Sequence, residues 1–289
     1  MLLSSHPPRI RRARPLLGTY VTVDVGAASG TDAHAAIDAA FAEIALLHRL
    51  MSFHAFDSDV SRLNRSAWHR PVAVDTRTAD VLRWAREIAE ASKGHFDVTV
   101  APQLVAARLL PWPDDACFPD ANACWRDIEV TADGDVRFQR PLWIDLGGIA
   151  KGYAVDCAVA ALAERGIERG CVNAGGDLRV IGTREPIALR SNMTHTVAVL
   201  EIEDASVASS SGRDFSARVP HLDGQRRQPV GHDCFVSVVA ERCVVADALT
   251  KVVLAAGAGS HALLRAYRAT AYLQNAVGAW QRIGLEAAA

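Results

Sequence analysis

The sequence predicts an α+β fold with a mixed, largely antiparallel sheet core and flanking helices. Hairpin signals, such as Asp133-Gly134 within the alternating run Ile128–Phe138, indicate antiparallel strands joined by tight turns. Helical periodicity occurs in isolated stretches, which argues against a doubly wound parallel sheet. We expect residues 16–289 to form a single domain after a flexible N-terminal tail at residues 1–15.

Periodicity and capping residues define the elements of the N-terminal half. Leu16–Val25 alternates apolar and polar residues like a strand. Apolar residues recur at helical spacing over Ala33–Met51, and we expect a polar loop with a short helical turn to follow as far as Asn64. Thr78 is placed to cap a second helix, which Gly94 ends. Prolines then predict an irregular connection up to the hairpin.

The C-terminal half contains the most informative stretch, Ile144–Gly182. Its pattern predicts a strand, a glycine turn, a helix and another strand. A later helix is expected over Val245–Ala256, with Gly257 as its C-terminal cap. The remaining expected elements are strands at residues 196–204 and 235–241, a short helix after Ser260 and two strands from Ala269.

Two glycine pairs in this stretch each lie beside a carboxylate, and a lysine follows the first pair. Paired glycines let a ligand approach the backbone, and N–H groups at a helix start favour an anion such as phosphate. Neither the P-loop nor the Rossmann glycine pattern is present, and plain turns are the competing interpretation. The candidate residues are Asp145, Gly147, Gly148, Lys151, Gly175, Gly176 and Asp177.

Two other regions carry candidate chemistry. Asp247 and Lys251 lie four residues apart on one predicted helix. They form either an exposed ion pair or, facing a phosphate, a charged site in which Asp247 holds a cation. A hydroxyl cluster that ends at Ser211 and Gly212 is either a solvated turn or a phosphate contact. His221 follows in a polar loop and is a candidate acid or base, because histidine titrates near neutrality.

Composition argues against several classes of protein. The formal net charge of −2 gives no electrostatic footprint for nucleic acid or anionic membrane. No apolar run approaches the ~20 residues of a membrane span. Without a signal-peptide pattern or an N-terminal lipid-anchor cysteine, cytoplasmic localisation is expected. Cys117 and Cys124 are a candidate disulfide, but free thiols fit better because nothing else indicates an oxidising compartment.

A series of sequence blocks runs along most of the chain. In order they are LLGTYVTV, MSFHAFDSDVSRLN, GHFDVTVAP, IDLGGIAKGYAVD, VNAGGDLRVIG, VASSSG and VVADALTKVVLAAG. Taken in this order, the blocks resemble the motifs of the FAD:protein FMN transferase (ApbE) family, and the similarity extends from about Leu17 to Gly284. The resemblance implies the family's fold, FAD as substrate, bound Mg²⁺, and transfer of FMN onto a threonine or serine hydroxyl of a target flavoprotein, with release of AMP.

The resemblance also implies roles for individual residues. Gly148 matches a residue whose backbone carbonyl binds the metal, and Asp247 matches a metal-binding carboxylate. His221 matches the histidine proposed to assist attack by the hydroxyl. Contacts to the nucleotide are expected from Leu17, His54, His95, Phe96, Asp97, Asp145, Lys151, Gly175, Gly176, Asp177, Ser211, Gly212 and Leu222.

The chain departs from the family pattern close to the chemistry. Lys251 stands where the family has a metal-binding threonine, and an ammonium cannot ligate Mg²⁺. Lys251 would therefore either replace the ion as a point charge or abolish the site. Leu17 and His54 replace a methionine and a tyrosine, and HLDGQRRQP replaces the family's H-x-x-D-P-x-T-G loop. Three functions are weighed: an FMN transferase, a non-catalytic paralogue that binds FAD or a partner, and an FAD pyrophosphatase that yields FMN and AMP.

Overall fold

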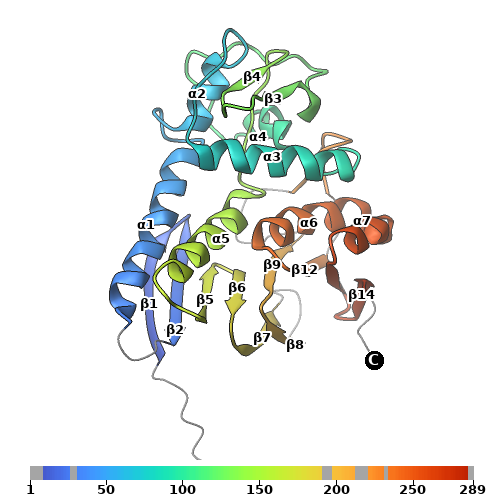
Figure 1. Ribbon diagram of the computed structural model, residues 1–289. Helices are drawn as coiled ribbons and strands as arrows, with labels where there is room; N and C mark the ends of the chain where they lie inside the picture. The colour runs from blue at the N-terminus through green and yellow to red at the C-terminus, as the bar shows by residue number, and fades with distance from the viewer. Residues whose placement is uncertain (1–8, 27–30, 191–196, 212–220, 231–233, 286–289) are drawn as a thin grey trace, which may run out of the picture.

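The chain is built on one large antiparallel sheet with helices packed above it (Figure 1). The computed structural model describes residues 9–26, 31–190, 197–211, 221–230 and 234–285. Every neighbouring strand pair in the eight-stranded sheet is antiparallel, so the predicted α+β fold is confirmed. In spatial order its strands are β1 (Arg9–Leu16), β2 (Thr19–Gly26), β5 (Arg169–Ala174), β6 (Asp177–Ile181), β9 (Ser206–Ser211), β12 (Cys234–Ala240), β13 (Thr270–Asn275) and β14 (Trp280–Gly284).

Three separate hairpins accompany this sheet. The predicted hairpin is confirmed as β3 (Ile128–Val130) and β4 (Val136–Phe138). A second hairpin pairs β7 (Arg184–Arg190) with β8 (Val197–Glu203). The third is a short pair, β10 and β11, that carries the divergent polar loop; its bounds are Leu222–Asp223 and Gln228–Pro229.

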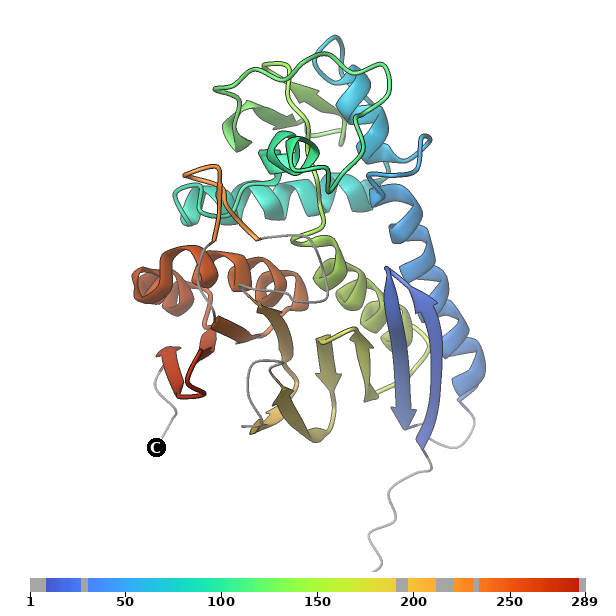
Figure 2. The ribbon, with the colours of Figure 1, turned by 180° about the vertical axis from the view of Figure 1, so that it is seen from behind.

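The helices form a layer on the sheet and a second tier above it, as the two opposite views show (Figures 1 and 2). Helices α5 and α6 are buried along much of their lengths, as expected for helices that are apolar on most sides. The layer contains α1 (Ala33–Met51), α5 (Ala150–Ala163), α6 (Cys243–Ala256), the 3₁₀ turn η3 (Gly257–Ser260) and α7 (His261–Ala266). The upper tier contains α2 (Asp59–Ser66), α3 (Thr76–Ala91), η1 (Val98–Val100), α4 (Ala101–Ala106) and η2 (Trp125–Asp127).

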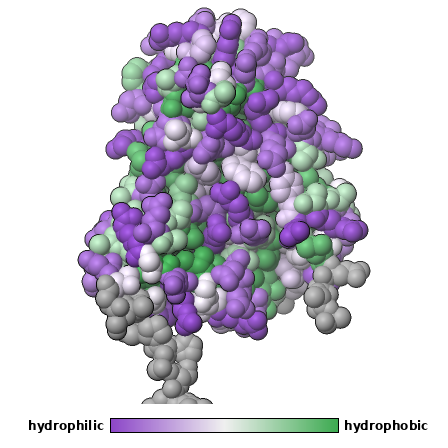
Figure 3. Space-filling view, viewed as in Figure 1, coloured by the Kyte–Doolittle hydropathy of each residue, from purple (hydrophilic) through white to green (hydrophobic). Residues whose placement is uncertain are grey.

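The distribution of apolar side chains follows these two tiers. One large core cluster runs through both tiers, and a smaller cluster lies between the β7–β8 hairpin and the large sheet. On the face seen in Figure 3, hydrophilic residues dominate over the upper tier, while apolar residues gather over the lower half that contains the sheet. The helix layer lies between the sheet and the upper tier (Figure 1). Segments from the helix layer and from the upper tier meet along this boundary.

The structure corrects three expectations from the sequence. Residues 9–15 are not a flexible tail but part of β1, in register with β2; four arginines in this strand hid its pattern, because they leave it no apolar face. The expected strand at Ile144 is irregular, because its backbone pairs with the Asn64 side chain instead of a neighbouring strand. Asp75, not Thr78, caps α3, while the Thr78 hydroxyl donates to Asp59.

Two expectations drawn from composition also meet the structure. Cys117 and Cys124 are both thiols, in agreement with the preference for thiols over a disulfide between them. The helical stretch Cys243–Ala266, which includes Asp247 and Lys251, is 24 residues long and on average apolar enough to cross a membrane by length and composition alone. Since 67% of its most apolar window is buried inside the fold, it has the character of a core helix.

Candidate active site

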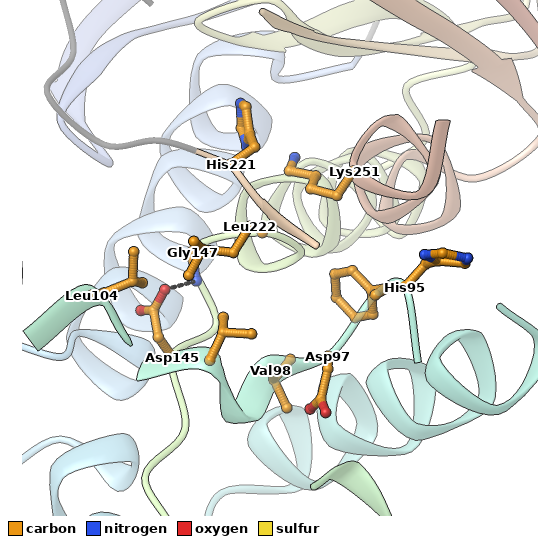
Figure 4. A pocket seen from close by; sticks show the side chains of 12 residues that line it. His95, Asp97, Val98, Leu104, Asp145, Gly147, His221, Leu222 and Lys251 are labelled. Atoms are coloured by element: carbon orange, nitrogen blue, oxygen red, sulfur yellow. Dashed lines mark hydrogen bonds between the residues drawn. The ribbon is translucent and has the colours of Figure 1, made fainter. Parts of the chain in front are cut away.

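An open cavity lies where α5 and α6 meet the upper tier, and Figure 4 shows the side chains that line it. Its empty space, counted together with its open mouth, is about 690 Å³. Segments far apart in the sequence converge here. The lining residues are His95, Phe96, Asp97, Val98, Val100, Leu104, Asp145, Gly147, Gly148, His221, Leu222 and Lys251.

A second cavity adjoins the first and shares Asp145 and Gly147 with it. It is lined by the β1–β2 turn, the end of α1, the loop that follows α1, and Lys151 of α5. A dinucleotide is a long, two-part ligand, and two cavities that meet at a glycine turn suit it. Together the cavities gather most of the predicted nucleotide contacts: Leu17, His54, His95, Phe96, Asp97, Asp145, Lys151 and Leu222.

The turn between the cavities is held in place by its own polar groups. The backbone N–H of Asp145 donates to the carbonyl of Val98 at 2.9 Å, and the Asp145 carboxylate accepts from the N–H of Gly147 at 3.2 Å. Helix α5 starts just beyond this turn, and no described side chain caps it. Its N-terminus therefore presents the positive end of the helix dipole to the cavities, which favours a bound anion.

Burial raises the pKa of Asp145, although the Gly147 N–H and the nearby His54 oppose this effect. A carboxyl whose pKa is higher when folded contributes stability at low pH and loses it as pH rises through the folded pKa. We therefore expect Asp145→Asn to unfold at a higher temperature than the wild type at neutral pH. The difference in unfolding temperature should shrink below about pH 4, because the carboxyl of Asp145 is then protonated in the unfolded chain as well. Thermal unfolding across this pH range checks it, and a wild type more stable than the variant at pH 7 would contradict it.

Two lysines and two buried aspartates form a charged cluster beside the cavities. Lys151 of α5 pairs with Asp177 at 2.5 Å, and Lys251 of α6 pairs with Asp247. Although burial works against its charge, the carboxylates of Asp177 and Asp247 raise the pKa of Lys151. Burial and the nearby Asp247 carboxylate raise the pKa of Asp177, while Lys151 and Lys251 oppose this rise. The predicted pair on α6 is thus part of a buried network and not an exposed ion pair.

Helices α5 and α6 reach this arrangement because Gly152 lets them touch. The Gly152 N–H donates to Asp247 Oδ2 at 2.9 Å. A Cβ at Gly152 would lie 2.3 Å from the carbonyl oxygen of Cys243 and 2.7 Å from the Cβ of Asp247. This close approach places both charged pairs on one side of the helix layer, and sequence analysis did not single out Gly152.

We expect Gly152→Ala to destabilise the protein. At an open helix position this change stabilises by about 1 kcal/mol, but here the clash with backbone forces α5 and α6 apart and costs about 1–3 kcal/mol. Denaturant unfolding measures the difference. The control is Ala160→Gly on the exposed side of α5, which should lose about 1 kcal/mol through helix propensity alone. A Gly152→Ala variant as stable as the wild type would show that the helices do not pack this closely.

The divergent loop is anchored to the upper tier by its own ion pairs. Arg227 donates to Asp97 Oδ2 at 2.9 Å and to the carbonyl oxygens of Thr99 and Ala123. His95 Nδ1 lies 3.0 Å from Asp223 Oδ1. These contacts fix the β10–β11 hairpin, which carries Leu222, over the cavity. The hairpin is thus attached to the upper tier through Asp97 and His95.

These anchors change how two predicted contacts are understood. The carboxylate of Asp97 also accepts from the backbone of Thr99 and Trp125 and points away from the cavity centre (Figure 4). His95 is turned toward Asp223. We therefore assign both side chains to positioning the hairpin, and direct contact of either with a nucleotide stays a prediction.

Five predicted contacts are not among the residues that line the cavities. Within the described part of the chain, Gly175, Gly176, Asp177 and Ser211 line neither one. Gly175 and Gly176 form the β5–β6 turn with positive φ angles, and Gly176 donates to the Asn173 side chain, so both serve a tight turn. Gly212 lies outside the described residues. A nucleotide contact from any of these five residues stays a prediction.

Sequence analysis missed two polar residues that assemble the site. Asn64 pairs with both the N–H and the carbonyl of Ile144, at 2.8 and 3.1 Å, and so holds the segment that leads into the glycine turn. Asp156 of α5 accepts from the N–H groups of Cys243 and Val244 and thereby caps α6 from another helix. A buried-polar signal inside an apolar helix could have found Asp156, since such a residue needs a partner.

Comparison with known proteins identifies the family. The model of the ApbE family matches residues 17–273, nearly the whole described chain. The chain belongs to the ApbE family. Among curated ApbE relatives, the FAD:protein FMN transferase of Vibrio cholerae is 28% identical over 230 residues, which cover 72% of this chain and 69% of that protein. One from Klebsiella pneumoniae is 26% identical over 258 residues, covering 80% and 74%.

Solved ApbE structures share the fold at lower sequence identity. The apo form of the flavinyl transferase ApbE of Pseudomonas stutzeri superposes with a TM-score of 0.83 at 21% identity, covering 98% of this chain and 96% of that one. The ApbE protein of Thermotoga maritima gives 0.82 at 23% identity, covering 96% and 97%. These likenesses establish that the sheet, the helix layer and the upper tier form an ApbE fold.

Proposed function

We propose that the protein is an FAD:protein FMN transferase, which moves the FMN part of FAD onto a threonine or serine hydroxyl of a target flavoprotein and releases AMP. One observation carries the proposal: two cavities join at the turn before the uncapped start of α5, and a lysine lines each of them, Lys251 the first and Lys151 the second. The helix start and the two ammonium groups offer N–H donors on both sides of this turn, and the pyrophosphate is the part of FAD that joins its two nucleotide halves. Curated relatives that bear this activity as their name support the assignment.

The residues of this chain divide the chemistry between binding and proton movement. The start of α5 and the two lysines neutralise the pyrophosphate and the charge that grows on the departing AMP. The hydroxyl oxygen of the target attacks the FMN phosphorus, a new P–O bond forms, and the P–O bond to AMP breaks. His221 lies on the cavity wall and accepts the proton of the attacking hydroxyl.

The residues at the position expected for Mg²⁺ do not fit that ion. Mg²⁺ requires a near-octahedral set of oxygen ligands. Both carboxylate oxygens of Asp247 already accept hydrogen bonds, one from Lys251 and one from the Gly152 N–H. No group of three His, Cys, Asp or Glu side chains that could hold a metal occurs among the described residues. We therefore derive no catalytic step through Mg²⁺.

Flavin fluorescence in a denaturing gel tests the proposed transfer. When the protein is co-expressed with a target flavoprotein that has an acceptor threonine or serine, we expect fluorescence to remain on the target after denaturation. A threonine-to-valine change at the acceptor should abolish it. Formation of FMN and AMP from FAD without any target would instead favour the pyrophosphatase. Stoichiometric FAD retention without AMP release would favour the non-catalytic paralogue.

A further inference from the structure

The ammonium of Lys251 is built into the cavity wall. Its side chain is only 11% exposed, and Asp247, its partner, is fully buried. Nζ donates to the Asp247 carboxylate and, at 3.0 Å, to the Asp247 backbone carbonyl. An ammonium has three protons, so these two bonds leave one for a group that enters the cavity, toward which Lys251 reaches in Figure 4.

The neighbouring hydroxyl is not available as a metal ligand either. Thr250 donates to the Asp247 carbonyl at 2.7 Å and shares a hydrogen bond with Ser210 at 2.8 Å. The Lys251 side chain also lies against Gly148, since a Cβ on Gly148 would be 3.7 Å from Lys251 Cε. The lysine thus occupies the space between Asp247 and Gly148, the two residues for which the sequence predicts metal binding.

The formal charge of the cluster is balanced without an added ion. Lys151 and Lys251 carry two positive charges, and Asp177 and Asp247 carry two negative charges. With a neutral residue in place of Lys251, Lys151 would be the one cation of the cluster beside two aspartates, and the cluster would carry a net negative formal charge. An uncompensated buried carboxylate is costly and attracts a cation. The lysine therefore fulfils the electrostatic requirement that a bound cation would otherwise meet.

We propose that Lys251 replaces a divalent cation in this protein, so that the pyrophosphate of FAD is bound and FMN is transferred without a metal ion. The proposal rests on the proposed function and concerns the same site. Lys251 acts as a fixed point charge on the phosphates. It exchanges no atom: the target oxygen bonds to the FMN phosphorus, AMP leaves with its bridging oxygen, and the hydroxyl proton passes to His221.

Calorimetric titration of FAD into the protein tests this directly, once in excess EDTA and once in excess Mg²⁺. We expect the wild type to bind FAD equally well in both. Lys251→Thr restores the family's residue and should weaken binding by about ten- to a hundredfold in EDTA, with recovery in Mg²⁺. Lys251→Met keeps the length of the side chain without its charge and should weaken binding in both. Wild-type binding that is lost in EDTA and returns with Mg²⁺ would overturn the proposal.

A second measurement separates this proposal from the proposed function, because it needs no FAD. Mn²⁺ alone is titrated into the protein, and the electron paramagnetic resonance signal of free Mn²⁺ reports how much remains unbound. We expect the wild type to leave the signal unchanged and Lys251→Thr to reduce it. Mn²⁺ binding by the wild type that is lost in Asp247→Asn would refute the replacement, even if FAD binds. If FAD fails to bind under either condition while Mn²⁺ behaves as expected, the function fails and the replacement stands.

Discussion

Replacing His221 by alanine should slow FMN transfer by about 10²- to 10⁴-fold, the usual contribution of a positioned general base. His221 is among the residues that line the first cavity and precedes Leu222, another lining residue, in the sequence. Because the ring takes a proton and is not proposed to hold the nucleotide, FAD affinity should change little. Single-turnover transfer to the target protein and calorimetric FAD binding measure the two quantities separately.

His69 provides a matched control for this prediction. It is an exposed histidine in the loop after α2, and it lines neither of the two described cavities. His69→Ala should transfer FMN at the wild-type rate. If His221→Ala also keeps the full rate, the proton of the hydroxyl goes elsewhere. If His221→Ala loses FAD binding in parallel with transfer, the His221 ring is a ligand of the nucleotide.

Replacing Lys151 by methionine should weaken both folding and FAD binding. Asp177 is only 1% exposed, and without Lys151 its carboxylate loses its ion-pair partner and keeps the weaker attraction of Lys251. Removing one partner of a buried pair costs about 3–5 kcal/mol; because Lys151 is itself 34% exposed, we expect the lower end of this range. Denaturant unfolding measures the loss.

The double variant Lys151→Met, Asp177→Asn separates the two effects. Replacing both members of a buried pair is often close to neutral for stability, so we expect most of the folding loss to be recovered. FAD binding should stay weak, because the cation at the junction of the cavities is still missing. Recovery of both properties in the double variant would mean that Lys151 has a structural role alone.

Local sequence patterns were sufficient for the elements whose signals are local. Helix α1 has the predicted bounds, because apolar residues recur along it at helical spacing. The β3–β4 hairpin follows from its alternating strands and from Asp133-Gly134. In contrast, β1 was missed, because its arginines pair with acidic residues on β2 and α1 and produce no apolar alternation.

The site shows the same division between local and long-range information. The glycine turn with Lys151, and the pair Asp247 and Lys251, were predicted because each is compact in sequence. Asn64 bonds to Ile144, 80 positions away, and Asp156 bonds to Cys243, 87 positions away. No local sequence pattern indicates such distant partners. The close approach at Gly152 likewise depends on how two helices dock. Sequence thus identified the charged groups, whereas the residues that hold them together emerged only from the packing.

A crystal structure of the protein with bound FAD tests the central claim most directly. The account predicts the pyrophosphate at the junction of the two cavities, within hydrogen-bonding distance of the start of α5, Lys151 and Lys251. It also predicts the FMN phosphorus facing His221, and no metal ion between Gly148 and Asp247. A pyrophosphate bound away from this junction, or a divalent ion seated there with Lys251 displaced, would contradict it.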